Sequence, residues 1–235
     1  NWKAGGSASS NTNGSITSQV SANPSAGFSI ATYTAGDSDE LIGHGLSIAP
    51  EVVIVKRRDN ATGNWVSFWT PLTSTNKQLY LNLTNAVDTP NLGTFNATTF
   101  RVNGWGDVVA SGSSYVAYCF HSVDGYSKVG SFVGNGSATA GPFVHLGFRP
   151  AFILTKRSDG TSPWRLFDNK RPDANFQTYK LEADSSGAEL TGYPYADFLS
   201  NGFKIRDDGS YINASGGTYV FLAFAESPFK HTNAR

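Results

Sequence analysis

The sequence predicts an all-β protein built from two tandem, homologous antiparallel β-sandwich domains of jelly-roll-like topology. Three observations support this prediction. Motifs of the first half recur in the same order in the second half, Gly, Ser, Thr and Asn are abundant, and aromatic residues reach 13% while charged residues stay at 15%. Turn formers and strand formers are therefore plentiful and helix formers scarce, which favours sheets.

The repeat is visible as a series of matched segments along the chain. The offset between them stays between 98 residues, the value for Gly27 and Gly125, and 104 residues, the value for Tyr115 and Tyr219. A period of this length is too long for a solenoid unit and is about the size of one small domain. Two copies of one domain are therefore expected, and this organisation favours display or binding over catalysis.

These matches define three segments. We expect residues 27–124 to form sandwich repeat 1 and residues 125–235 to form sandwich repeat 2. Residues 1–26 differ from both copies and are rich in Ser, Asn, Thr and Gly, so they are too polar to bury much surface. They are expected to be a linker, an edge segment or the tail of an upstream repeat.

Each copy shows the same order of predicted strands. A short apolar run, opened by a proline and closed by basic residues, predicts a buried strand. A polar turn containing glycine follows it and leads to a segment that begins with tryptophan, which is typical of a hairpin. A mostly apolar segment closes each copy and is expected to be a central strand. In chain order, the matched pairs are 52–55 with 152–155, 65–69 with 164–167, and 115–120 with 219–224.

Charge and composition disfavour several classes of partner. Lys and Arg total 18, as do Asp and Glu, so no overall field attracts nucleic acid or acidic lipid. No apolar run approaches the roughly 18 to 20 residues that cross a bilayer, so no membrane insertion is expected. The single cysteine, Cys119, lies in an apolar strand and is expected to be an inert core thiol. Without disulfides, stability must come from core area and subunit contacts.

The sequence offers little for catalysis. The four histidines are scattered without the spacing of a metal site or a nucleophile–base pair, so no cofactor and no metal are expected. The best carboxylate pair for glycoside hydrolysis is Asp168 with Glu182 or Glu189. The first copy has Thr70 near the position of Asp168, and a duplication without a matched carboxylate weakens this hypothesis. We therefore expect a protein that is not an enzyme.

Binding is the stronger functional hypothesis. Sugars are held by an aromatic face that stacks on the pyranose and by planar polar groups that meet its hydroxyls. Trp65 and Trp164 recur at matched positions, which favours core packing for both. Trp105 and the pair of Tyr193 and Tyr195 lack matched partners and lie among turn residues, so they are expected to be exposed, toward a glycan or a neighbouring subunit. The candidate ligand-binding residues are Trp105, Arg171, Asp173, Tyr193 and Tyr195.

Several longer strings are more specific than these patterns, and together they cover essentially the whole chain. They include NWKAGG at 1–6, YVAYCF at 115–120, GFRPA at 147–151, DFLSNGFK at 197–204 and AFAESPFK at 223–230. With them the chain resembles a repeat family in the C-terminal part of large structural proteins of marine bacteriophages, often labelled tail-fibre-like. In that family an upstream repeat ends in Trp-Lys-Ala-Gly-Gly, which would place Asn1 at the end of a preceding copy. The resemblance implies a location on the virion surface and no assigned catalytic residues.

These observations lead to one expected function and two alternatives. The chain is expected to be a non-enzymatic virion structural protein, part of a fibre or other appendage, that contacts host surface glycans or neighbouring subunits. Fibres usually form closed cyclic oligomers, so a homo-oligomer, with a trimer favoured, and other virion proteins are the expected partners. The alternatives are a secreted tandem carbohydrate-binding module and, less favoured, a polysaccharide hydrolase.

Overall fold

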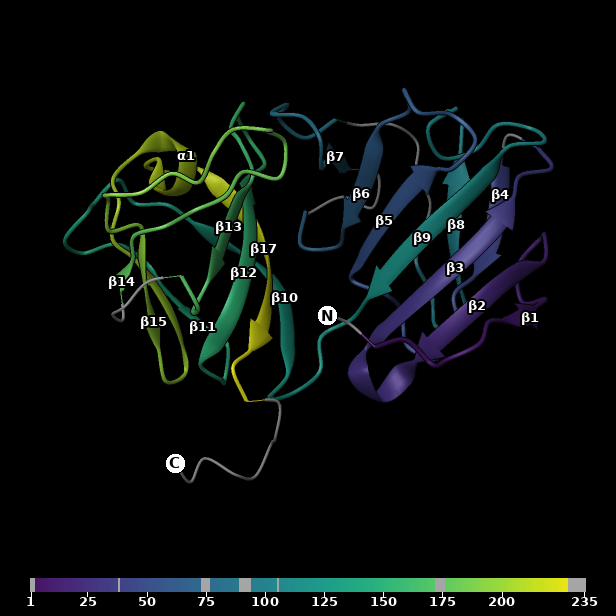
Figure 1. The fold of residues 1–235 in the computed structure, drawn as a ribbon, viewed down its shortest axis with the longest axis horizontal. Coiled ribbons are helices and arrows are strands. Elements are labelled where there is room, and N and C mark those ends of the chain that lie inside the picture. The colour runs from purple at the N-terminus through teal and green to yellow at the C-terminus, as the bar shows by residue number, and fades with distance from the viewer. Residues whose placement is uncertain are drawn as a thin grey trace. The chain divides into compact units, whose positions relative to one another are not determined.

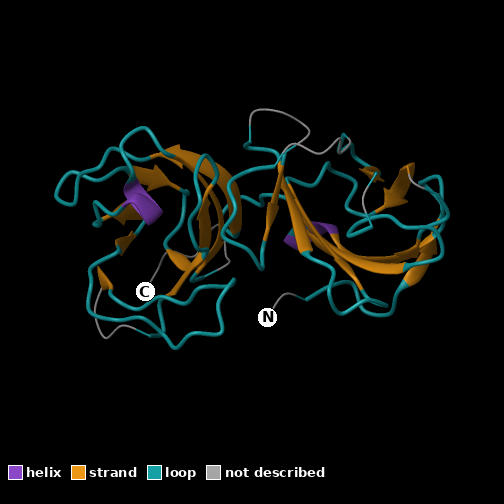
Figure 2. Cartoon of the chain, turned by 90° about the horizontal axis from the view of Figure 1, so that it is seen from above, coloured by secondary structure: helices purple, strands orange, loops and turns teal. Residues whose placement is uncertain are grey.

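A computed structural model describes residues 3–37, 39–72, 77–88, 94–104, 106–171 and 176–227 (Figure 1). The structure is 45% strand and 3% helix over this part of the chain, and strands dominate the view from above (Figure 2). The prediction of an all-β fold with antiparallel sheets is therefore confirmed. The chain divides into two compact units, described in turn below: unit 1 comprises Asn1–Leu81 and Val87–Ser122, and unit 2 comprises Asn82–Ala86 and Val123–Arg235.

The described residues of unit 1 form one large antiparallel sheet and one small one. The large sheet has the order β1-β2-β3-β9-β5-β6-β7, and β4 pairs with β8 in the small sheet. Two strands from the first 26 residues extend the large sheet beyond β3, after which a 3-10 turn, Pro24–Ala26, leads into β3. The strands are β1 (Ser9–Asn11), β2 (Ser18–Asn23), β3 (Phe28–Thr34), β4 (Asp39–Gly43), β5 (Val52–Arg57), β6 (Trp65–Trp69), β7 (Gln78–Tyr80), β8 (Thr99–Asn103) and β9 (Ser114–Phe120).

Unit 2 contains two sheets of four strands each within the described ranges. The first has the order β10-β17-β12-β13 and the second has the order β11-β16-β15-β14. A single helical turn, α1 (Ser210–Asn213), precedes the last strand. The strands are β10 (Ser127–Val133), β11 (Phe143–His145), β12 (Pro150–Arg157), β13 (Arg165–Asp168), β14 (Phe176–Gln177), β15 (Ala196–Leu199), β16 (Gly202–Ile205) and β17 (Thr218–Ala225).

The two units repeat one strand order. The order β3-β9-β5-β6 of unit 1 corresponds to β10-β17-β12-β13 of unit 2, and the pair β4-β8 corresponds to β11-β16. The registers also correspond, because Ile54 lies between Tyr118 and Ser67 as Leu154 lies between Leu222 and Leu166. A duplicated domain would produce this pattern, and it allows positions in the two units to be compared residue by residue.

The core of unit 2 lies between its two sheets. Side chains alternate along each strand, so every second residue points inward. Ile153 and Phe167 from the first sheet and Phe198 and Phe203 from the second belong to one buried hydrophobic cluster. The Phe203 ring meets the Phe221 ring edge to face, with 5.6 Å between the centroids. One continuous cluster joining both sheets is the defining property of a sandwich.

The matched tryptophans differ in burial. Trp164 is fully buried, as predicted. Trp65 is only half-buried, and its ring stacks on Tyr118 with 6.4 Å between the centroids, so the expected core position was wrong for this residue. Cys119 is inaccessible, and burial raises the pKa of its thiol to about 12, which agrees with an inert core residue.

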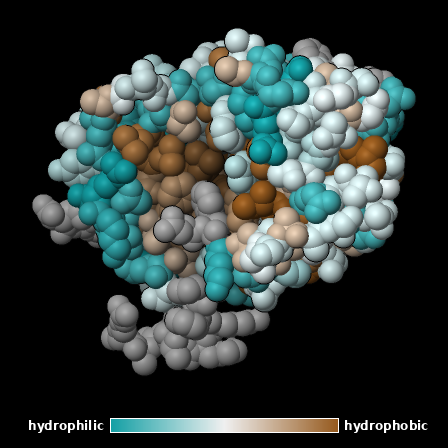
Figure 3. Space-filling view, turned by 45° about the vertical axis from the view of Figure 1, so that its right-hand side comes forward, coloured by the Kyte–Doolittle hydropathy of each residue, from teal (hydrophilic) through white to brown (hydrophobic). Residues whose placement is uncertain are grey.

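Exposed apolar side chains are spread unevenly. In the space-filling view, apolar residues gather in patches surrounded by polar ones (Figure 3). The exposed aromatic residues in the described ranges, Phe143, Phe176, Tyr193 and Tyr211, all belong to unit 2. No helix in the described part of the chain is long and apolar enough to cross a membrane. Exposed aromatic rings are the groups that sugars and protein partners most often contact, so unit 2 is the place to look for a site.

Candidate functional site

Tyr193 and Tyr195 are both expected to be exposed, and the structure supports only the first. Tyr193 is 55% exposed, whereas Tyr195 is 9% exposed and belongs to the buried cluster of unit 2. The prediction was wrong for Tyr195 because its ring turns inward and approaches the Phe167 ring, with 5.9 Å between the centroids. Trp105 and Asp173, the other aromatic and acidic candidates, lie outside the described residues.

Arg171 contacts acidic side chains of its own unit. Its guanidinium forms ion pairs with the carboxylates of Asp168 and Glu189. These two carboxylates form one of the pairs considered for glycoside hydrolysis, and the guanidinium lies on both of them. Neither carboxylate is therefore available to act on a glycosidic bond while Arg171 stays in place. Glu182, the alternative partner of Asp168, forms ion pairs with Arg165 and Lys180 instead.

Near Tyr193 the structure assembles a group of side chains that we call the aromatic–basic cluster. It consists of Arg165, Lys180, Glu182, Tyr195 and Tyr211. The rings of Tyr193 and Tyr195 are 6.3 Å apart between centroids, so Tyr193 lies at the edge of this cluster.

Strand pairing brings the charged members of the cluster together. Leu166 of β13 donates a backbone hydrogen bond to the carbonyl of Leu181 at 2.8 Å, and Leu181 donates one back at 3.1 Å. This antiparallel bridge places Glu182 opposite Arg165. Arg165 lies two residues before Phe167 on β13, so their side chains are on the same face of the strand. Because Phe167 faces the core, Arg165 also points inward. The sandwich thus carries a charged group at a core-facing position.

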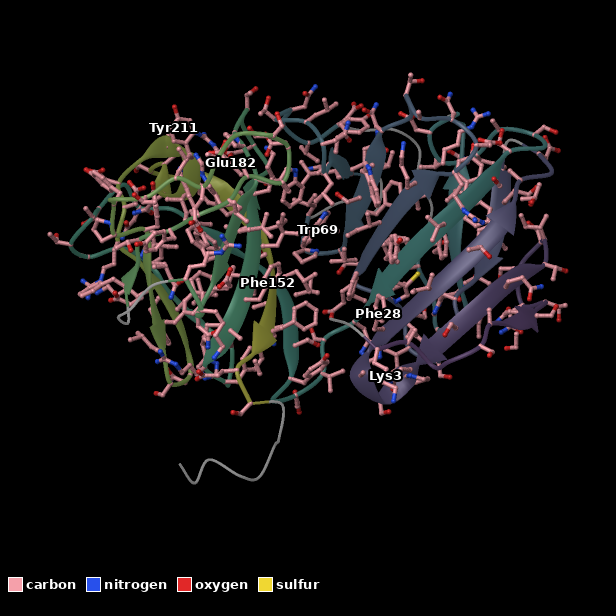
Figure 4. The ribbon with its side chains drawn as sticks, in the orientation of Figure 1. Lys3, Phe28, Trp69, Phe152, Glu182 and Tyr211 are labelled. Carbon is pink, nitrogen blue, oxygen red and sulfur yellow. The ribbon has the colours of Figure 1, made fainter. Side chains whose placement is uncertain are left out.

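The members of the cluster contact one another in a chain of charges and rings. The Glu182 carboxylate forms an ion pair with Arg165, and its Oε1 lies 3.7 Å from the Lys180 Nζ. The Arg165 guanidinium lies 5.2 Å from the centre of the Tyr211 ring, and Lys180 Nζ lies 4.7 Å from the centre of the Tyr195 ring. Glu182 and Tyr211 can be followed in Figure 4. Each cation therefore has an anionic partner and an aromatic face.

Burial strongly affects the ionisation of the two cations. Arg165 is 4% exposed and Lys180 is 7% exposed. Burial lowers the pKa of Arg165, and burial together with the charge of Arg165 lowers the pKa of Lys180 to about 8. Burial also raises the pKa of the Tyr195 hydroxyl. Titratable groups perturbed by desolvation and by specific charged neighbours occur preferentially at functional sites.

Unit 1 fills the corresponding positions without cations. Ser67 pairs with Leu79 in unit 1 as Leu166 pairs with Leu181 in unit 2, which fixes the alignment of the two segments. The positions that correspond to Arg165, Lys180 and Glu182 are Val66, Gln78 and Tyr80. The same scaffold therefore folds with uncharged side chains at these three positions.

In unit 1 a hydrogen-bonded network that ends on the Asp88 carboxylate takes the place of these ion pairs. The Gln78 side-chain amide donates to the Tyr80 hydroxyl at 2.5 Å, and that hydroxyl donates to Asp88 at 3.2 Å. Packing alone is thus satisfied by a valine, an amide and a phenol. The buried charges of unit 2 are not required by the strand pairing, and this difference marks the cluster as a candidate site.

Lysine burial predicts a distinctive pH dependence of stability. The pKa values of Lys156 and Lys180 are both lowered to about 8 from 10.5, chiefly by burial. Because the unfolded state then binds more protons between these values, the free energy of unfolding should rise as the pH increases from about 8 toward 10. Thermal unfolding across this range should show the rise, and it should be smaller in Lys180→Met and unchanged in the exposed control Lys128→Met. A flat or falling profile in the wild-type protein would contradict this expectation.

The sequence held a partial signal for the cluster. Arg165 lies two residues before a phenylalanine of a predicted strand. A charged residue in this position is unusual, and the sequence alone shows it. No local pattern marked Lys180 or Tyr211. Lys180 comes near Arg165 through the bridge between Leu166 and Leu181, and Tyr211 comes near it because α1 places its ring there.

The group assembled in unit 2 contains no set of three or more potential metal-ligating side chains, and the same holds throughout the described ranges. No curated protein and no solved structure matches the chain. The family described as a domain of unknown function, DUF7483, matches residues 1–228, and the chain belongs to this family.

Proposed function

We propose that the chain is a non-enzymatic module of a virion appendage, tail-fibre-like, that binds host surface glycans through the aromatic–basic cluster and Tyr193. The observation that carries the proposal is the position of two exposed rings, Tyr193 and Tyr211, beside buried and ion-paired Arg165 and Lys180. An exposed ring next to fixed polar groups is the usual composition of a sugar-binding site.

Each part of the cluster has a role in this proposal. The exposed tyrosine rings stack on the apolar face of a pyranose. Glu182, the more exposed of the charged side chains, accepts hydrogen bonds from sugar hydroxyls, while buried Arg165 and Lys180 hold its carboxylate in place. The ion pairs hold these side chains in place before the ligand arrives, so that less conformational entropy is lost on binding.

The virion location rests on the resemblance of long sequence strings to phage fibre-like repeats. A balanced formal charge supports a surface role without general attraction to nucleic acid. In this proposal the chain assembles into a closed homo-oligomer, with a trimer favoured, alongside other virion proteins. A secreted carbohydrate-binding module would use the same cluster, and detection of the protein in purified phage particles separates the two.

A glycan array followed by titration calorimetry tests the binding site. The wild-type protein should bind a defined set of glycans, and Tyr193→Ala and Tyr211→Ala should each weaken binding by about tenfold, because each removes one stacking ring. Tyr211→Phe should retain most of the affinity. The matched control is Ile48→Ala, which removes an exposed apolar side chain from unit 1.

Two outcomes would count against the proposal. One is a wild-type protein that binds no glycan on the array, and the other is a pair of tyrosine variants with wild-type affinity. An assay for new reducing ends on the glycans that bind tests the non-enzymatic part, since hydrolysis would release them and binding alone would not.

A further inference from the structure

The outer face of the second sheet of unit 2 carries one row of side chains, with one residue from each strand. Phe143 of β11 pairs with Lys204 of β16, Lys204 pairs with Asp197 of β15, and Asp197 pairs with Phe176 of β14. We call these four residues the outer row; β11, β14 and β15 are labelled in Figure 1. Their chain neighbours, such as Phe203, face the core, so the row faces away from it.

An exposed aromatic ring stands at each end of the outer row. Phe143 is 46% exposed and Phe176 is 48% exposed. The Phe143 ring lies against Gly202, where an added Cβ would come within 3.1 Å of two ring atoms. Glycine at this position therefore leaves the space that the ring occupies over the sheet. The two phenylalanines therefore lie on the outer face of the sheet and do not pack in the core.

The middle of the row is polar and incompletely satisfied. Asp197 is 3% exposed, and its Oδ2 forms an ion pair with Nε of half-buried Arg206 at 2.5 Å. Its other oxygen, Oδ1, is buried without a hydrogen-bond partner among the residues that the structure describes. Buried polar atoms in native structures usually have a partner, which can be an ordered water, so this oxygen marks the middle of the row as unusual. Lys204, also half-buried, lies beside it in the row.

We propose that the outer row is a platform for an extended oligosaccharide that lies across the four strands. Phe143 and Phe176 stack on sugar rings at its two ends, Lys204 and Arg206 bind hydroxyls between them, and the buried Asp197 carboxylate holds Arg206 in place. Because neighbouring strands are about 4.8 Å apart, the row is about 14 Å long between its outer Cα atoms, which is about three linked pyranose units. The inference rests on the proposed glycan-binding function. It adds a second binding site and the length of the oligosaccharide that this site binds.

Polar groups between the rings favour a sugar over an apolar protein surface. A protein partner that covered both rings would also bury the exposed parts of Lys204 and Arg206, and burial of charged groups without new partners is costly. Sugar hydroxyls supply both donors and acceptors along the same line. A row with an aromatic ring at each end and charged side chains between them therefore suits a carbohydrate chain, which presents both apolar ring faces and hydroxyls.

Titration calorimetry with chito- and laminari-oligosaccharides of increasing length tests the platform. Affinity should increase up to about three sugar units and then level off, because the rings at the two ends are then both covered. Phe143→Ala and Phe176→Ala should each weaken binding of the trisaccharide by about fivefold to tenfold, while the monosaccharide, which covers only one ring at a time, should lose less affinity because the other ring remains. Both side chains are exposed, so thermal unfolding should show an unchanged fold.

Variants of the aromatic–basic cluster separate this inference from the proposed function. Tyr211→Ala should leave binding of the trisaccharide to the outer row unchanged, and Phe176→Ala should leave binding at the aromatic–basic cluster unchanged, as expected for two separate sites. If the phenylalanine variants bind every oligosaccharide length like the wild-type protein while the tyrosine variants lose affinity, the platform is overturned and the cluster stands. If the wild-type protein binds neither oligosaccharide series nor any glycan of the array, both are overturned.

Discussion

Replacing Phe203 with alanine should lower the free energy of unfolding of unit 2 by about 3–5 kcal/mol. The side chain is 1% exposed and lies in the cluster that joins the two sheets. Its ring meets Phe132 and Phe221 edge to face at centroid distances of 5.9 and 5.6 Å. The substitution leaves a cavity in the middle of the sandwich and removes two aromatic contacts, each of which stabilises beyond its buried area.

Urea unfolding monitored by hydrogen exchange in peptides from β16 and β17 measures this loss for unit 2. The control is Phe143→Ala, which removes the same side chain from an exposed position on the neighbouring strand and should cost less than about 1 kcal/mol. Equal losses for the two variants would mean that the core does not lie between these sheets.

Glu182→Ala should destabilise unit 2 by about 3–5 kcal/mol, because it leaves two buried cations without their shared carboxylate. Arg165 and Lys180 are both more than nine-tenths buried, and Glu182 is the acidic side chain that forms ion pairs with both. An exposed pair makes a useful contrast. Asp39→Ala removes the partner of Arg101 at the surface and should cost less than about 1 kcal/mol.

Unit 1 supplies a sharper control for the same cluster. A triple variant with Arg165→Val, Lys180→Gln and Glu182→Tyr copies the neutral side chains of the corresponding positions. Replacing a whole buried ion-pair group with packed neutral residues is often neutral or stabilising. The triple variant should therefore fold at least as stably as the wild-type protein and lose glycan binding. A triple variant as unstable as Glu182→Ala would instead assign the charges a structural role.

Strand positions were readable because local patterns determine them. The apolar runs at 52–55 and 152–155 lie in β5 and β12, and the closing apolar segments lie in β9 and β17. The order of the strands in each sheet was not predicted, since it depends on contacts between distant segments. The sequence pattern also did not predict how deeply each strand residue is buried. Trp65 and Trp164 carry the same local signal, yet one is half-buried and the other inaccessible.

The candidate site was less predictable than the strands. Tyr193 was identified correctly as exposed because it lies among turn residues. Tyr195 shares that context but precedes β15, where its ring enters the core beside Phe167. Lys180 and Glu182 belong to no named strand, and a single bridge to β13 brings them to Arg165. The parts of the site that depend on long-range pairing were therefore missed, whereas the part set by a local turn was found.

Unit 2 is not continuous in the chain, and this affects how the protein can be divided for experiments. Asn82–Ala86 belong to unit 2 although the chain on either side of them belongs to unit 1. The carbonyl of Thr84 accepts hydrogen bonds from Lys156 Nζ at 3.2 Å and from the Ser162 amide at 2.9 Å. A gene fragment that starts at Val123 would encode a C-terminal half without this acceptor. Such a half would need the missing peptide supplied separately, as in fragment complementation, to restore both hydrogen bonds.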